Sequence, residues 1–300
     1  MGFDRSAFLS AYDALLDRWP VPVETLDLDT PWGTTRVNAA GPPDAPPLLL
    51  LHGGGATAAS WWANAAELAR TARVYAVDRI GEAGRSTAGD RTPPRTVDDL
   101  HRWLDTVLDA LGAERVDLCG HSYGGWIALD HALRRPERVS RLALLDPTGC
   151  FTGYRPSYLL HAAPMLARPS ERRARAFLAW ETGGVPLDPD WTRLYGLAAT
   201  FPATRPVTGP RPAPAALAAL EAPCLLLPAA DSRTHHPGTL AARAAALLPR
   251  ARVRTLAGVS HHGLPYLRPA ELNAELTAFL GPSSPDAPSP GASPSPSPAA

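Results

Sequence analysis

The amino-acid sequence predicts an α/β fold, in which a mostly parallel sheet carries helices on both faces. Short apolar runs alternate with helical patterns along most of the chain. Several runs, such as residues 48–51, are continuously apolar, which is typical of strands covered on both sides. Residues 147–214 break the rhythm and are rich in Pro, Arg and aromatic side chains. We expect this insertion at the carboxyl ends of the strands, where such sheets bind ligands.

Turn residues and periodicity define the elements in order. In the first half we expect a helix over 4–18, antiparallel strands over 23–28 and 34–39, a strand over 47–52, a helix over 60–70, a strand over 73–78 and a helix over 96–111. In the second half we expect a strand over 115–119, a helix over 123–134, strands over 141–145 and 224–227, a helix over 239–248, a strand over 253–256 and a helix over 269–280.

These elements divide the chain into an N-terminal helix, an interrupted core, an insertion and a tail. The helix takes residues 1–22, the α/β core takes 23–146 and 215–281, and the insertion takes 147–214. Residues 282–300 are mostly Pro and Ser and contain almost nothing that could be buried, so we expect a disordered tail.

Composition and charge exclude several classes of protein. With 45% hydrophobic and 19% charged residues, the chain can build a packed core and is not wholly disordered. Basic and acidic residues balance at 29 each, so no net field attracts nucleic acid or an anionic membrane. No apolar run approaches the ~20 residues of a membrane span, and the N-terminus lacks a secretory pattern, so we expect a cytoplasmic protein. The cysteines, Cys119, Cys150 and Cys224, have no metal-type spacing and are expected to be buried.

The most specific motif is G-x-S-x-G, from Gly120 to Gly124, between a predicted strand and a predicted helix. A chain that passes from strand to helix within one residue strains the serine backbone and holds Ser122 Oγ exposed above the sheet. Gly120 and Gly124 lack side chains that would collide across this elbow. The N–H of the next residue, Tyr123, points at the same place. Ser122 is therefore a candidate nucleophile.

Two further features suit nucleophilic chemistry. Residues 52–55, His-Gly-Gly-Gly, follow a buried strand, and their backbone N–H groups could approach an oxyanion, although a plain glycine turn is an equal alternative. Among the histidines, His261 follows the last predicted strand and is a candidate general base. The partner carboxylate is predicted to be Asp231, four residues after the strand over 224–227, with Asp146 at the end of the preceding strand as the alternative.

Residues 25–280 resemble the α/β-hydrolase superfamily, in which nucleophile, acid and histidine follow one another in the order Ser122, Asp231, His261. The Trp61-Trp62 pair after the glycine loop and the stretch 75–81 are similar to small bacterial carboxylesterases. The resemblance implies an eight-stranded sheet, a helical cap formed by the insertion and no cofactor. It also implies the following site residues: the triad Ser122, Asp231 and His261, and an oxyanion hole made by Gly54 and Tyr123.

The resemblance implies a serine hydrolase that cleaves carboxylic esters of small or medium apolar acyl groups through an acyl-enzyme. The expected partner is a small-molecule ester, with no nucleic acid or membrane. The pairs His235-His236 and His261-His262 could suggest a metal, but adjacent side chains on extended chain face opposite ways, so we predict none. A C–C bond hydrolase or thioesterase of the same fold, or an inactive ligand-binding member, remains an alternative. The natural ester and the oligomeric state are left open.

Overall fold

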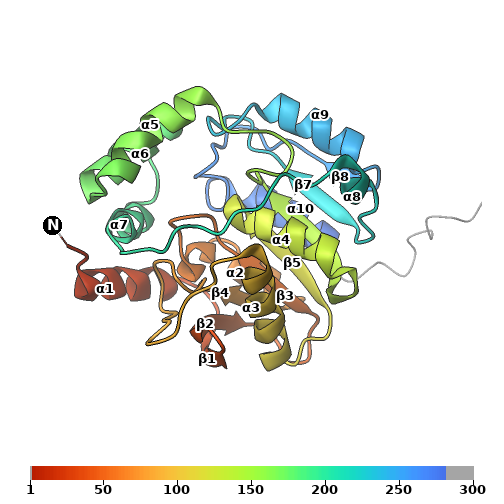
Figure 1. Cartoon of the computed structure of the whole chain (residues 1–300), viewed down its shortest axis with the longest axis horizontal. Helices are drawn as coiled ribbons and strands as arrows, with labels where there is room; N and C mark the ends of the chain where they lie inside the picture. Colours follow the sequence, from red (N-terminus) through yellow and green to blue (C-terminus); the bar gives the residue numbers. More distant parts are fainter. Residues whose placement is uncertain (1, 282–300) are drawn as a thin grey trace, which may run out of the picture.

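The computed structural model describes residues 2–281, and the predicted tail over 282–300 lies outside them (Figure 1). Within the described residues, eight strands form one sheet in the order β1-β2-β4-β3-β5-β6-β7-β8. Only β2 runs antiparallel to its neighbours, so the predicted fold class is confirmed. The strands are β1 Glu24–Thr30, β2 Gly33–Ala40, β3 Pro47–Leu51, β4 Arg73–Val77, β5 Val116–His121, β6 Val139–Leu145, β7 Cys224–Leu227 and β8 Ala251–Val253.

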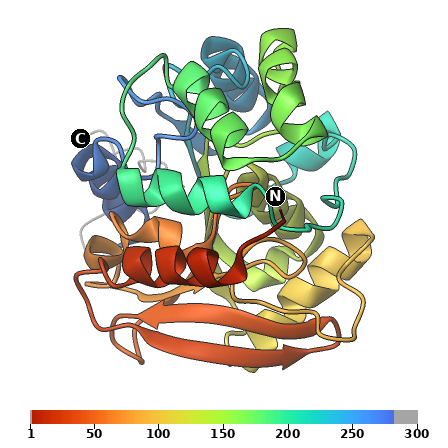
Figure 2. The same cartoon turned by 90° about the vertical axis from the view of Figure 1, so that its left-hand side faces the viewer.

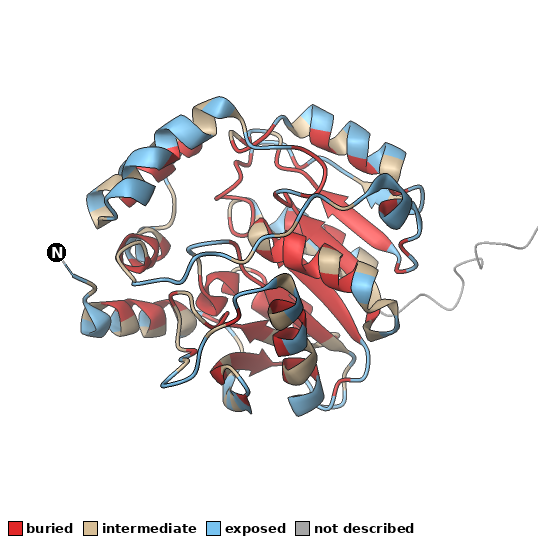
Figure 3. Cartoon of the chain, in the orientation of Figure 1, coloured by how far each residue is buried: buried red, intermediate tan, exposed pale blue. Residues whose placement is uncertain are grey.

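Helices cover both faces of the sheet and create two hydrophobic cores (Figure 3). Alternate side chains of β3 enter opposite cores: Leu48 and Leu50 pack with α1, α2 and α10, whereas Leu49 and Leu51 pack with α3, α4 and α9. Burial on both faces explains why this strand is continuously apolar. The helices of the core are α1 Arg5–Leu16, α2 Ala65–Leu68, α3 Val97–Ala110, α4 Tyr123–Arg134, α9 Pro237–Leu247 and α10 Pro269–Leu280, with 3₁₀ turns η1 Ala58–Trp61 and η2 Pro136–Arg138.

Two predicted elements differ from the structure. The helix expected over 60–70 is instead η1 followed by the short helix α2. Trp61 and Trp62 are both buried, so this segment packs on several sides and tertiary contacts override the helical pattern. The strand expected over 253–256 is β8, which ends at Val253, although an isolated parallel bridge between Ala229 and Leu256 extends the pairing.

The segment between β6 and β7 forms α5 Pro156–Ala167, α6 Glu171–Glu181, α7 Pro189–Ala198 and α8 Pro214–Ala218. We refer to α5, α6 and α7 as the cap helices. Figure 2 shows α1 running beside α7, and the two helices are in contact. Arg18, just after α1, forms ion pairs with Asp188 and Asp190 at the start of α7, at 2.8 and 3.1 Å. The N-terminal helix therefore packs against α7 and supports this side of the cap helices.

The close packing of α4 on the sheet depends on glycine. A Cβ atom at Gly124 would lie 2.2 Å from the carbonyl oxygen of Leu51, a backbone atom that has little freedom to move. We expect Gly124→Ala to lower the free energy of unfolding by about 1–3 kcal/mol, because the helix must shift away from β3. Gly238→Ala in α9 is the matched control, since nothing lies within 4 Å of its added Cβ.

Because alanine favours helices, the Gly238→Ala control is expected to be neutral or to stabilise by up to about 1 kcal/mol. Urea unfolding monitored by tryptophan fluorescence measures both changes. Equal stabilities of the two variants would contradict the packing described here.

Candidate active site

Ser122 lies at the junction between β5 and α4, in the backbone conformation that the G-x-S-x-G motif predicts. Its φ of 54° and ψ of −116° are unusual for a residue with a side chain. Three backbone hydrogen bonds hold this conformation: its N–H donates to Leu145 O at 2.9 Å, and its carbonyl oxygen accepts from Trp126 N and Thr148 N. The strain is therefore maintained by the surrounding fold, as is common at reactive residues.

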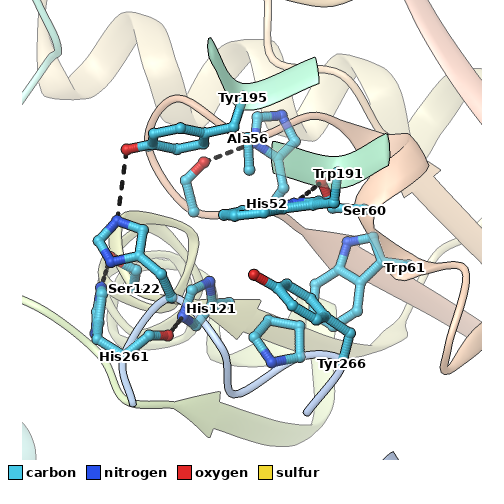
Figure 4. Close-up of a pocket in the computed structure, with 14 residues that line it drawn as sticks. His52, Ala56, Ser60, Trp61, His121, Ser122, Trp191, Tyr195, His261 and Tyr266 are labelled. Carbon is cyan, nitrogen blue, oxygen red and sulfur yellow. Dashed lines mark hydrogen bonds between the residues drawn. The ribbon is translucent and has the colours of Figure 1, made fainter. Parts of the chain in front are cut away.

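His261 connects Ser122 to a carboxylate. Its Nε2 lies 2.8 Å from Ser122 Oγ (Figure 4). Its Nδ1 lies 2.6 Å from Asp146 Oδ2. All three residues are buried. They come from the ends of β5 and β6 and from the loop that follows β8, so the parallel sheet brings together residues that are far apart in the chain. The predicted meeting of Ser122 with His261 is present in the structure.

The prediction that Asp231 meets this imidazole is wrong, and the alternative, Asp146, occupies the position. Asp231 is exposed, and its backbone N–H pairs with Val259 O at 3.0 Å. Asp146 follows β6, the neighbouring strand, with a φ of 42°, and its Oδ1 accepts the N–H of Ala229 at 3.0 Å. The loop after β7 thus turns the side chain of Asp231 to solvent. The same loop supports Asp146 through the backbone N–H of Ala229.

A second imidazole, which the sequence analysis considered only as part of a metal pair, also contacts Asp146. His235 Nε2 lies 2.8 Å from Asp146 Oδ1, and both side chains are buried. Burial by itself raises the pKa of Asp146, but hydrogen bonds from His235 and His261 outweigh it and hold this pKa well below the usual carboxyl range. Within residues 2–281, no group of His, Cys, Asp and Glu has the arrangement of a metal site.

His261 is tuned to be neutral. Burial lowers its pKa below 6.5, and Asp146 opposes this effect only in part. His121, next to Ser122, has a pKa lowered to about 3 by burial and by the nearby His261, so it is also neutral. Its Nε2 lies 2.9 Å from the carbonyl oxygen of His261 and can donate to it. Sequence reasoning did not predict this support for residues 261–262, which we call the histidine loop.

The glycine loop after β3 lies directly beside Ser122. A Cβ atom at Gly53 would lie 2.8 Å from His121 Nδ1 and 3.3 Å from Ser122 Cβ, so glycine allows this close approach. The buried side chain of Arg79 contacts the carbonyl oxygens of His52 and Gly53 and lies 4.9 Å from the centre of the Tyr123 ring. Arg79 was missed by the sequence analysis. Because it draws the carbonyl groups to one side, it favours a loop whose N–H groups face the other way.

The pocket beside Ser122 is lined mainly by aromatic side chains from both the core and the cap helices. Of the aromatic residues in the insertion, Trp191 and Tyr195 line the pocket, whereas the half-buried Tyr158 and Trp180 pack against Phe177 of the cap helices. The core contributes Trp61 and Tyr266 (Figure 4) and also the imidazole of His262. The arrangement therefore offers an apolar chamber next to a hydroxyl group that is hydrogen-bonded to a neutral imidazole.

Comparison with known proteins agrees with the fold described above. Residues 48–275 match the alpha/beta hydrolase family. The chain belongs to this family. Its similarity to small bacterial carboxylesterases, predicted from the motifs, is also confirmed: carboxylesterase YbfK of Bacillus subtilis is 33% identical over 59% of this chain. A second carboxylesterase of the same organism, nap, is 32% identical over 58% of this chain. The aligned segments span little more than half of these relatives, 58% and 56% of their own length.

Solved structures extend the similarity over nearly the whole alpha/beta hydrolase chain. Naproxen esterase (carboxylesterase NP) from Bacillus subtilis superposes with a TM-score of 0.84 at 28% identity, covering 92% of this chain and 98% of that one. Carboxylesterase CesB (YbfK) gives 0.82 at 30% identity, covering 91% and 96%. In the part of the chain that the structure describes, no helix has both the length and the apolar character needed to cross a membrane.

The choice between the two carboxylates can be tested without a substrate. A short hydrogen bond between His261 Nδ1 and Asp146 is expected to give a strongly downfield imidazole proton resonance. We expect Asp146→Asn to abolish this resonance and Asp231→Asn, the matched control on an exposed carboxylate, to retain it. One-dimensional proton spectra, with His261→Gln to assign the signal, measure the effect. Loss of the resonance in Asp231→Asn alone would restore the original prediction.

Proposed function

We propose that this alpha/beta hydrolase cleaves carboxylic esters with Ser122 as nucleophile, His261 as general base and Asp146 as the carboxylate that orients the imidazole. The observation that carries the proposal is the continuous hydrogen-bonded path from Ser122 Oγ through the ring of His261 to Asp146, at 2.8 and 2.6 Å. These are the contacts that a nucleophile and its base require. The names of the carboxylesterase relatives support an ester as the substrate.

The proposed reaction has two halves. In the first, Ser122 Oγ attacks the ester carbonyl carbon while its proton passes to His261 Nε2, and the carbonyl oxygen becomes an oxyanion. The tetrahedral intermediate collapses with cleavage of the C–O bond, and His261 returns the proton to the departing alcohol. In the second half, water loses a proton to His261 and attacks the acyl-enzyme, which releases the carboxylic acid and regenerates Ser122. Asp146 stabilises the imidazolium that forms in each half.

We assign the oxyanion hole to the N–H groups of Gly54 and Tyr123. Tyr123 is the first residue of α4, where backbone N–H groups have no partner within the helix. Gly54 lines the same pocket as Ser122, and a Cβ atom on it would lie 4.0 Å from Tyr123 Cβ. The contact of Arg79 with the carbonyl oxygens of the glycine loop supports this orientation. Each such donor is worth roughly 10²–10³ in rate.

We propose acyl groups of small or medium size, and the aromatic lining of the pocket supports their apolar character. Trp61, Trp191, Tyr195 and Tyr266 surround it, and burial keeps the pKa of Tyr195 and of Tyr266 well above that of free tyrosine, so their hydroxyl groups stay neutral. The pocket therefore presents no phenolate charge to an apolar substrate.

The assignment of Ser122 is tested with p-nitrophenyl esters of increasing acyl length. Wild type is expected to hydrolyse them with a maximum at short or medium chains, and Ser122→Ala is expected to lower kcat by roughly 10⁴–10⁶-fold. A fluorophosphonate probe should label wild type and fail to label Ser122→Ala. Thioesters and vinylogous 1,5-diketones, assayed in parallel, separate ester hydrolysis from the thioesterase and C–C hydrolase alternatives. Wild type without probe labelling would indicate an inactive ligand-binding member.

The pH dependence follows from the pKa of His261. Burial lowers this pKa below its ordinary value of 6.5, and a general base works only when neutral. Activity is therefore fully present above the folded-state pKa and lost as the pH falls through it. We expect the acid limb of kcat/KM to have its midpoint below pH 6.5, measured at the isosbestic wavelength of p-nitrophenol. A midpoint clearly above 6.5 would contradict the assigned environment of His261.

A further inference from the structure

A carboxylate lies on the apolar face of the cap helix α6. The buried positions of this helix are Ala174, Phe177, Leu178 and Glu181, a spacing that places all four side chains on one face. Glu181 has no exposed surface. A buried charge is costly unless other groups compensate for it, so its presence at a position that would otherwise hold an apolar side chain calls for specific partners.

The partners of Glu181 are the two residues of the histidine loop, His261 and His262. Glu181 Oε1 accepts the backbone N–H of His261 at 3.1 Å, and Oε2 accepts the backbone N–H of His262 at 3.2 Å. Oε2 also lies 3.2 Å from His262 Nδ1, which makes an ion pair when that imidazole is protonated. One carboxylate of a cap helix thus spans two consecutive peptide groups of the core.

Glu181 is ionised at neutral pH in spite of its burial. Burial raises its pKa, but the imidazoles of His262 and His261 and the backbone N–H of His262 together lower this pKa to about 2. Hydrogen bonds to an ionised acceptor are shorter and stronger than those between neutral groups. The contact between α6 and the histidine loop is therefore a strong and directional one.

With Glu181 included, both ring nitrogens, the carbonyl oxygen and the backbone N–H of His261 each have a hydrogen-bond partner. Asp146 and Ser122 hold the two ring nitrogens, His121 can donate to the carbonyl oxygen, and Glu181 accepts from the backbone N–H. Three of these partners belong to the core. Glu181 alone belongs to the cap helices, so it links the position of the cap to the position of the imidazole.

The site as described is nearly closed, since Ser122 is 8% exposed and His261 is 2% exposed. Tyr195 of α7 lies against Gly55 of the glycine loop, where an added Cβ would be 3.3 Å from the ring. Movement of the cap helices away from the core would widen the access of a substrate to Ser122 Oγ. Such a movement would pull Glu181 from the two peptide groups that it holds.

We propose that Glu181 is a positioning residue that couples the seating of the cap to the orientation of His261, so that the base is aligned only when α6 rests on the histidine loop. This inference rests on the proposed function of His261 as general base. Its physical basis is that the carboxylate accepts hydrogen bonds from the backbone N–H groups of both His261 and His262. Without the carboxylate, both N–H groups would lose this acceptor.

The test replaces the carboxylate without changing its shape. Glu181→Gln keeps one acceptor oxygen but places an NH₂ group against the second N–H. We expect kcat for a p-nitrophenyl ester to fall by roughly 10–100-fold with KM changed less than about threefold, because alignment is lost rather than substrate binding. Glu171→Gln is the matched control on the same helix, since Glu171 pairs with Arg175 and is partly exposed. We expect its kcat to be unchanged.

The pH profile provides a readout that a purely structural role would not change. The groups that face His261 from the surrounding elements are Asp146, Glu181, His121, His235 and His262. The charge of Glu181 raises the pKa of His261. Its removal should therefore move the acid limb of kcat/KM to lower pH in Glu181→Gln and leave it in place in Glu171→Gln. Glu181→Asp keeps the charge, so its limb should stay near that of wild type, with an intermediate kcat.

A proton spectrum separates failure of this inference from failure of the proposed function. The downfield resonance of the His261–Asp146 hydrogen bond does not depend on hydrolysis, and it is expected to broaden or shift in Glu181→Gln but not in Glu171→Gln. Equal kcat, acid limb and resonance in the two variants would overturn the coupling, as would a change in KM alone. If wild type hydrolyses no ester, the proposed function fails, and the resonance still decides whether Glu181 positions His261.

Discussion

The buried carboxylate of Asp146, like any charge in a dry interior, is stable only when hydrogen-bond donors surround it. It lies between the rings of His235 and His261 and accepts a backbone N–H from the loop after β7. Those donors keep it ionised, and its charge in turn fixes the tautomer and direction of the His261 ring. If Asp146 were neutral, neither imidazole would have a charged hydrogen-bond partner to fix its orientation. The hydroxyl of Ser122 would then face a His261 ring that is not aligned with it.

The order of the parallel strands brings these donors to Asp146. Strands β5, β6 and β7 are neighbours, so the residues that follow each of them meet at one edge of the sheet. Two of the three non-glycine residues with positive φ in the described part of the chain, Ser122 and Asp146, lie at this edge. Strain is thus concentrated where the side chains must converge, and the packed strands beneath hold it there.

The cap helices supply more than a cover for the pocket. They are held from below by α1, line the apolar chamber with Trp191 and Tyr195, and reach the histidine loop through Glu181. The helices that cover the pocket therefore also contact the loop that carries His261. A site covered in this way has little contact with bulk water, which strengthens the electrostatic interactions inside it.

The sequence by itself determined the sheet, most of the helices, the elbow at Ser122 and the choice of His261, because each is encoded by neighbouring residues: continuous apolar runs, glycines at fixed spacing, and a motif between a strand and a helix. It could not choose correctly between Asp146 and Asp231, since both follow buried strands and only the path of the loop after β7 turns one of them to solvent. The contacts of His235, Arg79 and Glu181 likewise could not be predicted from the sequence, because their partners are distant in the chain. Local patterns specify local conformation, whereas the pairing of buried charges is decided by which surfaces the tertiary fold brings together.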